Sequence, residues 1–361
     1  MKKVAFICAA NIKHMTLISL YTDLFRKCGQ NFDIIYVDKY HEIEEYDGVG
    51  KLYRYELTLK PNWSFFRKLI AYWGFKKFAI NIIKKEQYDF IIVWNEFTGF
   101  MFEDFLRKKY AFRYCINIRD ENFNHISFIQ HRYKRMIEKS CFNTISSDRF
   151  KEIFPKGDYL FIQSYNKELI KGVECVSQKR SENEPIRVMF IGRMSYPETM
   201  GRAIEAFAND KRFELWLIGD GCETFRGRVK EMNADNVIIH GAFKPKETVE
   251  YLKHADVIYS LNKENDIHSD SLLPIKLYYA IARHVPILAY KSSYTYEYAK
   301  KYGFGIGITD AEFKNIANVV LDEYNLLQQK DVDEGCYRAL EDIEKGRCEL
   351  NRLITKHVFN N

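Results

Sequence analysis

The sequence predicts an α/β protein built from two doubly wound, Rossmann-like parallel-sheet domains that face a central cleft. Its 361 residues suit two domains of ordinary size. In both halves short apolar segments alternate with helix-like segments, which is typical of parallel sheets covered by helices. A polar stretch at residues 177–185, SQKRSENEP, interrupts the two series. We expect domains at 1–168 and 169–335, and a C-terminal helix at 336–361 that packs back on the first domain.

The first half carries five strand-like segments, and a helix near residues 16–28 follows the first of them. Strands are expected at residues 4–8, 32–37, 90–94, 113–118 and 143–146. Ligands of such sheets bind outside the carboxyl ends of the strands. The titratable residues just past these ends, which we take as candidates for an acceptor substrate, are His14, Glu96, Asp120, Glu121 and His125. Each of them is equally well explained as a solvated loop residue.

The second half repeats the alternation with five more strands. Strands are expected at residues 187–191, 214–218, 237–240, 257–261 and 286–290, with helices at 198–208, 222–232 and 246–254. The first three strands end in Gly192, Gly219 and Gly241, and glycine permits close backbone approach. A single glycine at a strand end indicates no more than a turn. Three of them beside Arg193, a permanent bidentate phosphate binder, predict a nucleotide platform.

Residues 255–289 carry the most informative pattern in the chain. A strand runs into a polar loop at 262–273, and Pro274 then opens a helix at the position where proline is favoured. Lys276 falls in the first turn, where a cation opposes the helix dipole by about 0.3–1 kcal/mol. A bound anion would remove the conflict, because free backbone N–H groups, the dipole and the ammonium would converge on it. The alternative is that Lys276 projects into solvent.

Several other classes of protein are a poor fit. No GxGxxG opens a helix and no GxxxxGK[ST] occurs, which disfavours dinucleotide dehydrogenases and P-loop enzymes. The eight cysteines show no CxxC spacing, so we expect free thiols in a reducing cytoplasm and no metal site. The only DxD, at residues 331–333, is better explained by helix capping than by metal binding. A net charge of +6 permits an acidic partner without requiring nucleic acid.

Four successive motifs resemble glycosyltransferase family 4, the retaining enzymes of the GT-B fold. They are VMFIGRMSYPETMGRAIEAF, FELWLIGDGCETF, NVIIHGAFKPKETVEYLKHADVIYSL and SDSLLPIKLYYAIARHVPILA. The pattern looks closest to bacterial capsule and cell-surface polysaccharide transferases. The resemblance is specific over residues 186–290 and weak over the first half.

The resemblance implies a donor site for a nucleotide diphosphate sugar, most commonly a UDP-sugar, without a metal cofactor. Gly192, Arg193 and Lys276 match the residues that face the donor diphosphate. Of the family's two glutamates, eight positions apart, the first falls on Ser271 and the second on Tyr279, while Asp270 is adjacent to the first. The remaining donor-site residues implied by the resemblance are Gly219, Asp220, Gly221, His240, Phe243 and Leu272.

The acceptor side and the catalytic set follow from the same resemblance. Family members often have a histidine that touches the transferred sugar, and His125 is the first choice for it and His14 the second. The predicted catalytic set is therefore Arg193, Lys276, Asp270 and His125. The lost glutamates leave open whether activity is redirected or abolished.

Residues 63–85, WSFFRKLIAYWGFKKFAINIIKK, predict a basic amphipathic helix. The segment holds seven aromatic and six basic residues and no acidic residue. Such helices are typical of membrane-surface binders, although a core-facing helix with a basic solvated side explains the pattern equally well.

The predicted function is a cytoplasmic, peripheral-membrane hexosyltransferase of surface polysaccharide synthesis, acting on a lipid-linked saccharide. A non-catalytic GT-B partner and a nucleotide-sugar 2-epimerase are the alternatives.

Overall fold

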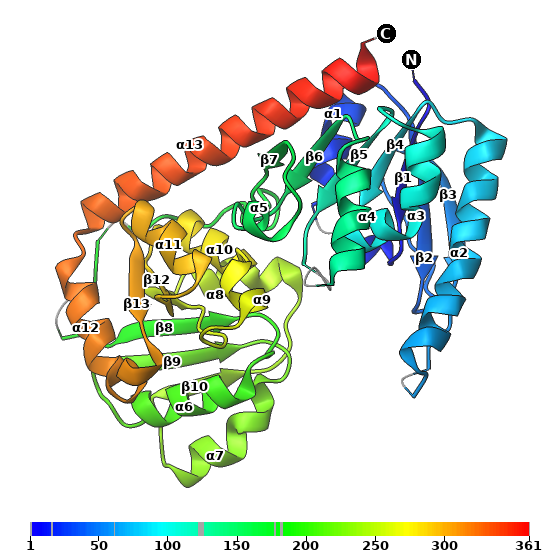
Figure 1. Ribbon diagram of the computed structural model, residues 1–361. Helices are drawn as coiled ribbons and strands as arrows, with labels where there is room; N and C mark the ends of the chain where they lie inside the picture. Colours follow the sequence, from blue (N-terminus) through cyan, green and yellow to red (C-terminus); the bar gives the residue numbers. More distant parts are fainter. Residues whose placement is uncertain are drawn as a thin grey trace. The chain divides into compact units, whose positions relative to one another are not determined.

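The computed structural model describes residues 2–15, 17–60, 62–121, 126–176, 178–180 and 183–360. The chain forms two compact units, each with its own parallel sheet (Figure 1). Unit 1 comprises Met1–Gln163 with Lys345–Asn361, and unit 2 comprises Ser164–Glu344.

The sheet of unit 1 has seven parallel strands in the order β3-β2-β1-β4-β5-β6-β7. The five expected strands are confirmed to within one residue at each end. The edge strands β3 and β7 were not predicted, because their residues are only partly buried and lack a continuous apolar run. The strands are β1 (Val4–Cys8), β2 (Phe32–Asp38), β3 (Val49–Glu56), β4 (Phe90–Trp94), β5 (Tyr114–Ile118), β6 (Phe142–Ile145) and β7 (Tyr159–Phe161).

Helices cover both faces of this sheet. Helix α1 (Ser19–Lys27) packs on one face beside the last turns of α13 (Gln329–Ile354), whose Leu350 and Ile354 are buried in the same core. The π-helical turn Thr355–Phe359 follows, and Lys2 Nζ donates to the carbonyls of His357 and Asn360, each at 2.9 Å. The other helical segments are Ile12–His14, α2 (Phe65–Glu86), α3 (Glu96–Lys109), α4 (Ser127–Ile137) and α5 (Phe150–Ile153).

The sheet of unit 2 has six parallel strands in the order β10-β9-β8-β11-β12-β13. The five expected strands are confirmed, although β11 ends two residues early, at Tyr259. The edge strand β13 was not predicted, because its sequence GIGI is short and rich in glycine. The strands are β8 (Ile186–Ile191), β9 (Phe213–Ile218), β10 (Val237–His240), β11 (Val257–Tyr259), β12 (Ile287–Tyr290) and β13 (Gly305–Ile308).

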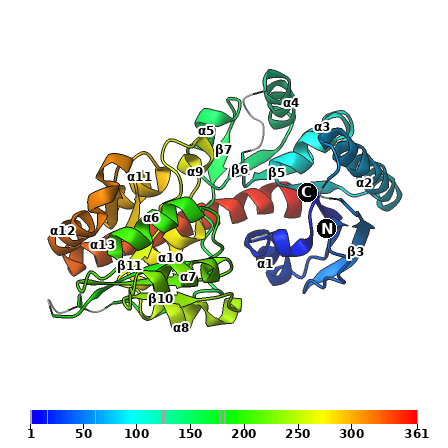
Figure 2. The same ribbon diagram turned by 90° about the horizontal axis from the view of Figure 1, so that it is seen from below.

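Helices flank this sheet in two layers (Figures 1 and 2). One layer holds α6 (Pro197–Phe207), α7 (Arg226–Glu231) and α12 (Ile316–Leu326), and the other holds α8 (Thr248–Leu252), α10 (Ile275–Arg283) and α11 (Tyr294–Lys301). Three expectations were wrong in detail. The loop at 262–273 contains a short helix, α9 (Ile267–Ser271). The helices expected at 222–232 and 246–254 each begin as a 3-10 turn, Cys222–Phe225 before α7 and Pro245–Glu247 before α8.

The glycines that end β8, β9 and β10 continue the sheet beyond its strands. Gly192 N donates to Ile218 O at 2.9 Å, and Gly219 N donates to Gly241 O at 3.1 Å. A Cβ on Gly219 would lie 1.8 Å from Gly192 O, and its φ of +138° already disfavours any other residue. Gly219 is therefore explained by a backbone contact that no side chain permits.

We expect Gly219→Ala to destabilise the protein by more than about 2 kcal/mol, through a backbone clash and a strained φ. Urea unfolding would measure the loss. Gly241→Ala is the matched control, since a Cβ there meets only the Glu223 carboxylate at 3.7 Å. Equal stability of the two variants would contradict the importance of the Gly192–Gly219 contact.

Candidate functional site

A cavity of about 370 Å³ in unit 2 is lined by both Arg193 and Lys276. It lies past the carboxyl ends of the central strands β8 and β11. From β8 the chain continues to its neighbour β9 and then to β10, whereas β11 to β13 are added on the other side of β8. The strand order therefore reverses between β8 and β11, and open α/β sheets bind ligands at such a point. The remaining lining residues are Phe190, Met194, Ser195, Tyr196, Met200, Leu261, Asn262, Ser269 and Leu272.

Lys276 is a buried ammonium without a counter-charge. Only 9% of the residue is exposed, and its Nζ lies 4.4 Å from the centre of the Phe190 ring. Burial lowers its pKa to about 8. In the described part of the chain no carboxylate pairs with it. A buried charge left unpaired is unfavourable, so this position favours an anionic ligand.

The helix that carries Lys276 begins without a side-chain cap. Pro274 stands at the N-cap, one position earlier than expected, and has no side chain that can accept a hydrogen bond. Within the described residues the amides of Ile275 and Lys276 donate to no acceptor. Two orphan N–H groups, the positive end of the helix dipole and the Lys276 ammonium therefore meet at one point.

Arg193 adds a second cation to the same cavity. Its side chain is exposed and has no ion-pair partner among the residues that the structure describes. The loop that carries it is held by Met194 N, which donates to Asp220 O at 2.9 Å. Among the described residues that line the cavity none is acidic, so the charge of this lining is positive.

Several predicted donor-site residues surround this cavity without lining it. The amides of Gly192 and Gly219 donate to carbonyls of the neighbouring strands and are not free for a ligand. Asp220 and Gly221 lie against the loop that carries Met194. Leu272 does line the cavity.

The positions of the two lost glutamates offer no carboxylate. Ser271 Oγ donates to Ile267 O at 2.6 Å within its own helix. Asp270, beside it, is buried, and its charge helps to raise the pKa of Tyr196, together with burial and Asp266. The Tyr279 hydroxyl is buried and hydrogen-bonded to Thr248, and burial raises its pKa to about 12.

The aromatic loop past β10 also lies apart from the cavity. The His240 ring stacks on Trp216 at 5.9 Å, and Phe243 packs edge-on against Tyr251. The structure does not bring the side chains of Tyr279, His240 and Phe243 into the cavity with Arg193 and Lys276.

The acceptor-side candidates lie in unit 1. Glu96 begins α3 and is buried, and it accepts a hydrogen bond from Asp120 N at 3.3 Å, while Glu121 N donates to Asp120 Oδ1. His14 Nε2 lies 3.1 Å from the Tyr40 hydroxyl, and burial lowers its pKa. His125 lies outside the described residues.

Among the described residues no cluster of three or more His, Cys, Asp or Glu side chains could hold a metal ion. In the tail DxD, Asp333 Oδ1 lies 2.9 Å from His284 Nδ1. Across the same described ranges, no helix has the length and apolar character needed to cross a bilayer.

Sequence reasoning missed Ser195, Tyr196, Asn262 and Ser269. The first two follow the Gly-Arg pair and the third follows β11, so their position past strand ends was the available signal.

Comparison with solved structures shows that both units together have the GT-B fold. Sucrose-phosphate synthase from Thermosynechococcus elongatus matches with a TM-score of 0.72 at 15% identity, over 99% of each chain. HepE from Anabaena in complex with UDP matches at 0.64 and 12% identity, over 98% of this chain and 100% of that one. The lipopolysaccharide outer core galactosyltransferase WaaB matches at 0.68 and 13% identity, over 99% and 100%.

No family model matches the sequence, and no curated protein matches it. The chain therefore has the GT-B fold, with a cavity in its second unit that is lined by Arg193 and Lys276.

We expect Lys276→Met to raise the unfolding temperature of the ligand-free protein by about 2–4 °C, the shift that about 1 kcal/mol produces in a domain of 150–250 residues. The variant replaces an unpaired buried charge with an apolar side chain of similar length. Calorimetry would measure it.

Lys76 is the matched control for this experiment. It is 7% exposed, but its Nζ pairs with Asp104 Oδ1 at 2.5 Å. Lys76→Met should leave stability unchanged or lower it by up to about 1 kcal/mol. If Lys276→Met does not raise the unfolding temperature above that of the wild type, and instead behaves as Lys76→Met does, Lys276 is not an uncompensated charge.

Proposed function

We propose that the protein is a retaining glycosyltransferase that binds a nucleotide diphosphate sugar, with the diphosphate between Arg193 and Lys276. The observation that carries this proposal is the buried, unpaired Lys276 ammonium at an uncapped helix N-terminus, in the same cavity as Arg193. A diphosphate satisfies all of these groups at once. The GT-B neighbours include a protein solved with UDP, which supports UDP as the first nucleotide to test.

The proposed mechanism is electrostatic. Departure of the nucleoside diphosphate develops negative charge on its bridging oxygen. In this proposal Arg193, Lys276 and the two orphan amides stabilise that charge. Each preorganised donor of this kind contributes about 3–4 kcal/mol of transition-state stabilisation in comparable sites. Same-face attack by the acceptor hydroxyl, assisted by the leaving phosphate, would retain the anomeric configuration.

The acceptor is proposed to be a saccharide, and a lipid-linked one of surface polysaccharide synthesis. Glu96, Asp120 and Glu121 gather at the carboxyl ends of β4 and β5, where an acceptor hydroxyl can be bound by carboxylates. The similarity to a lipopolysaccharide galactosyltransferase supports a hexose as the transferred group.

A non-catalytic GT-B nucleotide-binding protein is the second candidate. It is favoured by Ser271 and Tyr279, whose hydroxyls are already bonded to Ile267 and Thr248. Release of nucleotide from UDP-, GDP- and ADP-sugars, with and without a saccharide acceptor, separates the possibilities. Donor-dependent release supports the transferase, interconversion of two donors supports an epimerase, and nucleotide binding without turnover supports the binding protein.

UDP binding should depend on both cations. Arg193→Ala and Lys276→Met are each expected to weaken it by about 10- to 100-fold, the loss typical of a charge-assisted hydrogen bond. Tyr279→Phe, which removes a hydroxyl remote from the cavity, should bind as the wild type does. Titration calorimetry would measure all three, and unchanged affinity in both cation variants would refute the placement of the diphosphate.

The same binding should weaken at alkaline pH. The free-state pKa of Lys276 is about 8, and a bound diphosphate raises it. Affinity should therefore be level between pH 7 and 8 and fall by up to about tenfold per pH unit above 8, as the free protein loses the proton that the complex keeps. Lys276→Met should abolish this dependence. A wild-type profile that stays flat to pH 10 would show that Lys276 does not contact the nucleotide.

Helix α2 is proposed as a membrane-facing element that brings the protein to a lipid-linked acceptor. Its buried side consists of Tyr72, Phe75, Ala79 and Ile83, which partly bears out the core-facing alternative. On its other side Ile70 and Trp73 are 73% and 56% exposed, beside the exposed Arg67 and Lys77. Lys76 does not belong to this surface, because it is buried and paired with Asp104.

Sedimentation with phosphatidylglycerol-containing vesicles tests this surface. The double variant Ile70→Glu/Trp73→Glu is expected to lose at least half of the pelleted protein, because it removes exposed apolar area and adds negative charge. Leu326→Glu, at a residue 77% exposed on α12, is the control for general surface change. The proposal fails if wild-type protein stays in the supernatant or if the two variants pellet alike.

A further inference from the structure

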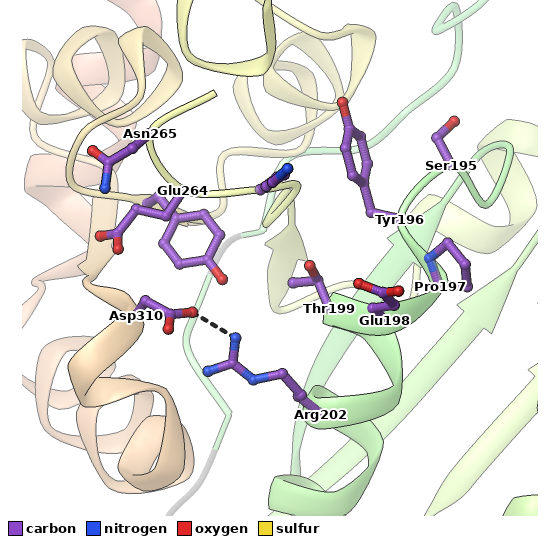
Figure 3. A pocket seen from close by; sticks show the side chains of 11 residues that line it. Ser195, Tyr196, Pro197, Glu198, Thr199, Arg202, Glu264, Asn265 and Asp310 are labelled. Carbon is purple, nitrogen blue, oxygen red and sulfur yellow. Dashed lines mark hydrogen bonds and ion pairs between the residues drawn. The ribbon is translucent and has the colours of Figure 1, made fainter. Parts of the chain in front are cut away.

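A second cavity of unit 2, of about 570 Å³, lies beside the first and belongs to no site described so far. It is bordered by the start of α6, the loop after β11, and the ends of β12 and β13. In Figure 3 Glu264 and Asp310 lie on one side of the opening and Glu198 and Thr199 on the other. The size suits a ligand of small-molecule dimensions.

The charge of this cavity is opposite to that of the first. Arg202 is not available to an anion, because it is ion-paired with Asp310 at 2.5 Å and lies over the Phe313 ring at 4.0 Å. The carboxylates of Glu198 and Glu264 have no hydrogen-bond or ion-pair partner in the described part of the chain. Lys263 is the one other cation of the lining, so the unpaired groups sum to a negative charge. The cavity disfavours phosphate and offers strong acceptors to hydroxyl groups.

A buried hydroxyl lies in the core beside this cavity. Tyr259, at the carboxyl end of β11, is fully buried, and its hydroxyl has no hydrogen-bond partner among the residues that the structure describes. It belongs to the same buried cluster as Tyr290, and Tyr290 lines the cavity. An orphan hydroxyl is unfavourable by about 1–3 kcal/mol, so the core beside the cavity contains an unsatisfied polar group.

The two cavities are neighbours that share Ser195 and Tyr196. Thr199 Oγ1, in the second cavity, donates at 2.6 Å to the carbonyl of Asn262, which lines the first. This bond joins α6 to the loop after β11, and residues of both elements line the two cavities.

We propose that the second cavity binds an uncharged saccharide unit, independently of nucleotide. Carboxylates that accept from neighbouring hydroxyls, the Tyr196 and Tyr290 phenols, and the Asn265 amide match the alternating donors and acceptors of a sugar ring. The inference does not depend on transferase activity, because it concerns binding alone.

Saturation-transfer NMR on the full-length protein without nucleotide tests the proposal, using glucose, galactose, N-acetylglucosamine and their methyl glycosides as probes. We expect millimolar binding of at least one probe, weakened tenfold or more in Glu198→Gln/Glu264→Gln. Because neither carboxylate has a partner, these isosteric changes should leave the unfolding temperature unaltered. Inorganic phosphate should not displace the sugar.

Arg193→Ala/Lys276→Met is the matched variant of the neighbouring cavity, and it should lose UDP but keep the sugar signal. If the wild-type protein binds a sugar probe but does not bind UDP, the proposed function is refuted and this inference stands. The inference is overturned if no probe binds, if the double glutamine variant binds undiminished, or if sugar binds only as part of a nucleotide sugar.

Discussion

The backbone contact between Gly192 and Gly219 is the constraint on which the site depends. Only a residue without a Cβ atom at position 219 allows the end of β9 to approach the Gly192 carbonyl this closely. The contact fixes the turn that follows β8, and Met194 is then held by Asp220 O. Arg193 therefore leaves the sheet in a direction that the backbone determines, toward the cavity that Lys276 also lines. The strand-end glycines act on a ligand indirectly, through the loop that they shape.

An uncompensated charge is tolerated at the centre of this arrangement. Helix α10 begins with a proline that cannot cap it and carries a lysine at the end of the dipole where cations are disfavoured. Each of these choices reduces the stability of the ligand-free protein, and one anion relieves both. Local rules broken together at one point are typical of functional sites, where stability is given up for binding.

Sequence reasoning was most successful where burial is complete. Strands such as β1 and β4 are buried along their whole length, so their apolar runs predicted them to the residue. The edge strands β3 and β13 escaped, because partial burial and glycine remove that signal. Arg193 and Lys276 were predicted to act together from the strand-end glycines and from the resemblance to glycosyltransferase family 4, and both line one cavity. The partners of Tyr279 and His240 depend on helix packing, which spacing does not encode.

The second cavity escaped for a different reason. Its residues come from four separate strand ends, none of which forms a sequence motif. The charge that they offer to a ligand depends on which of them are already ion-paired. Arg202 in isolation suggests anion binding, yet Asp310 and Phe313 occupy it, and the unpaired carboxylates reverse the sign of the cavity. Two adjoining cavities of opposite charge then favour different ligands, because cations attract phosphate while carboxylates accept hydrogen bonds from hydroxyl groups. The Thr199–Asn262 hydrogen bond joins α6 to the loop after β11, and residues of both elements line the two cavities.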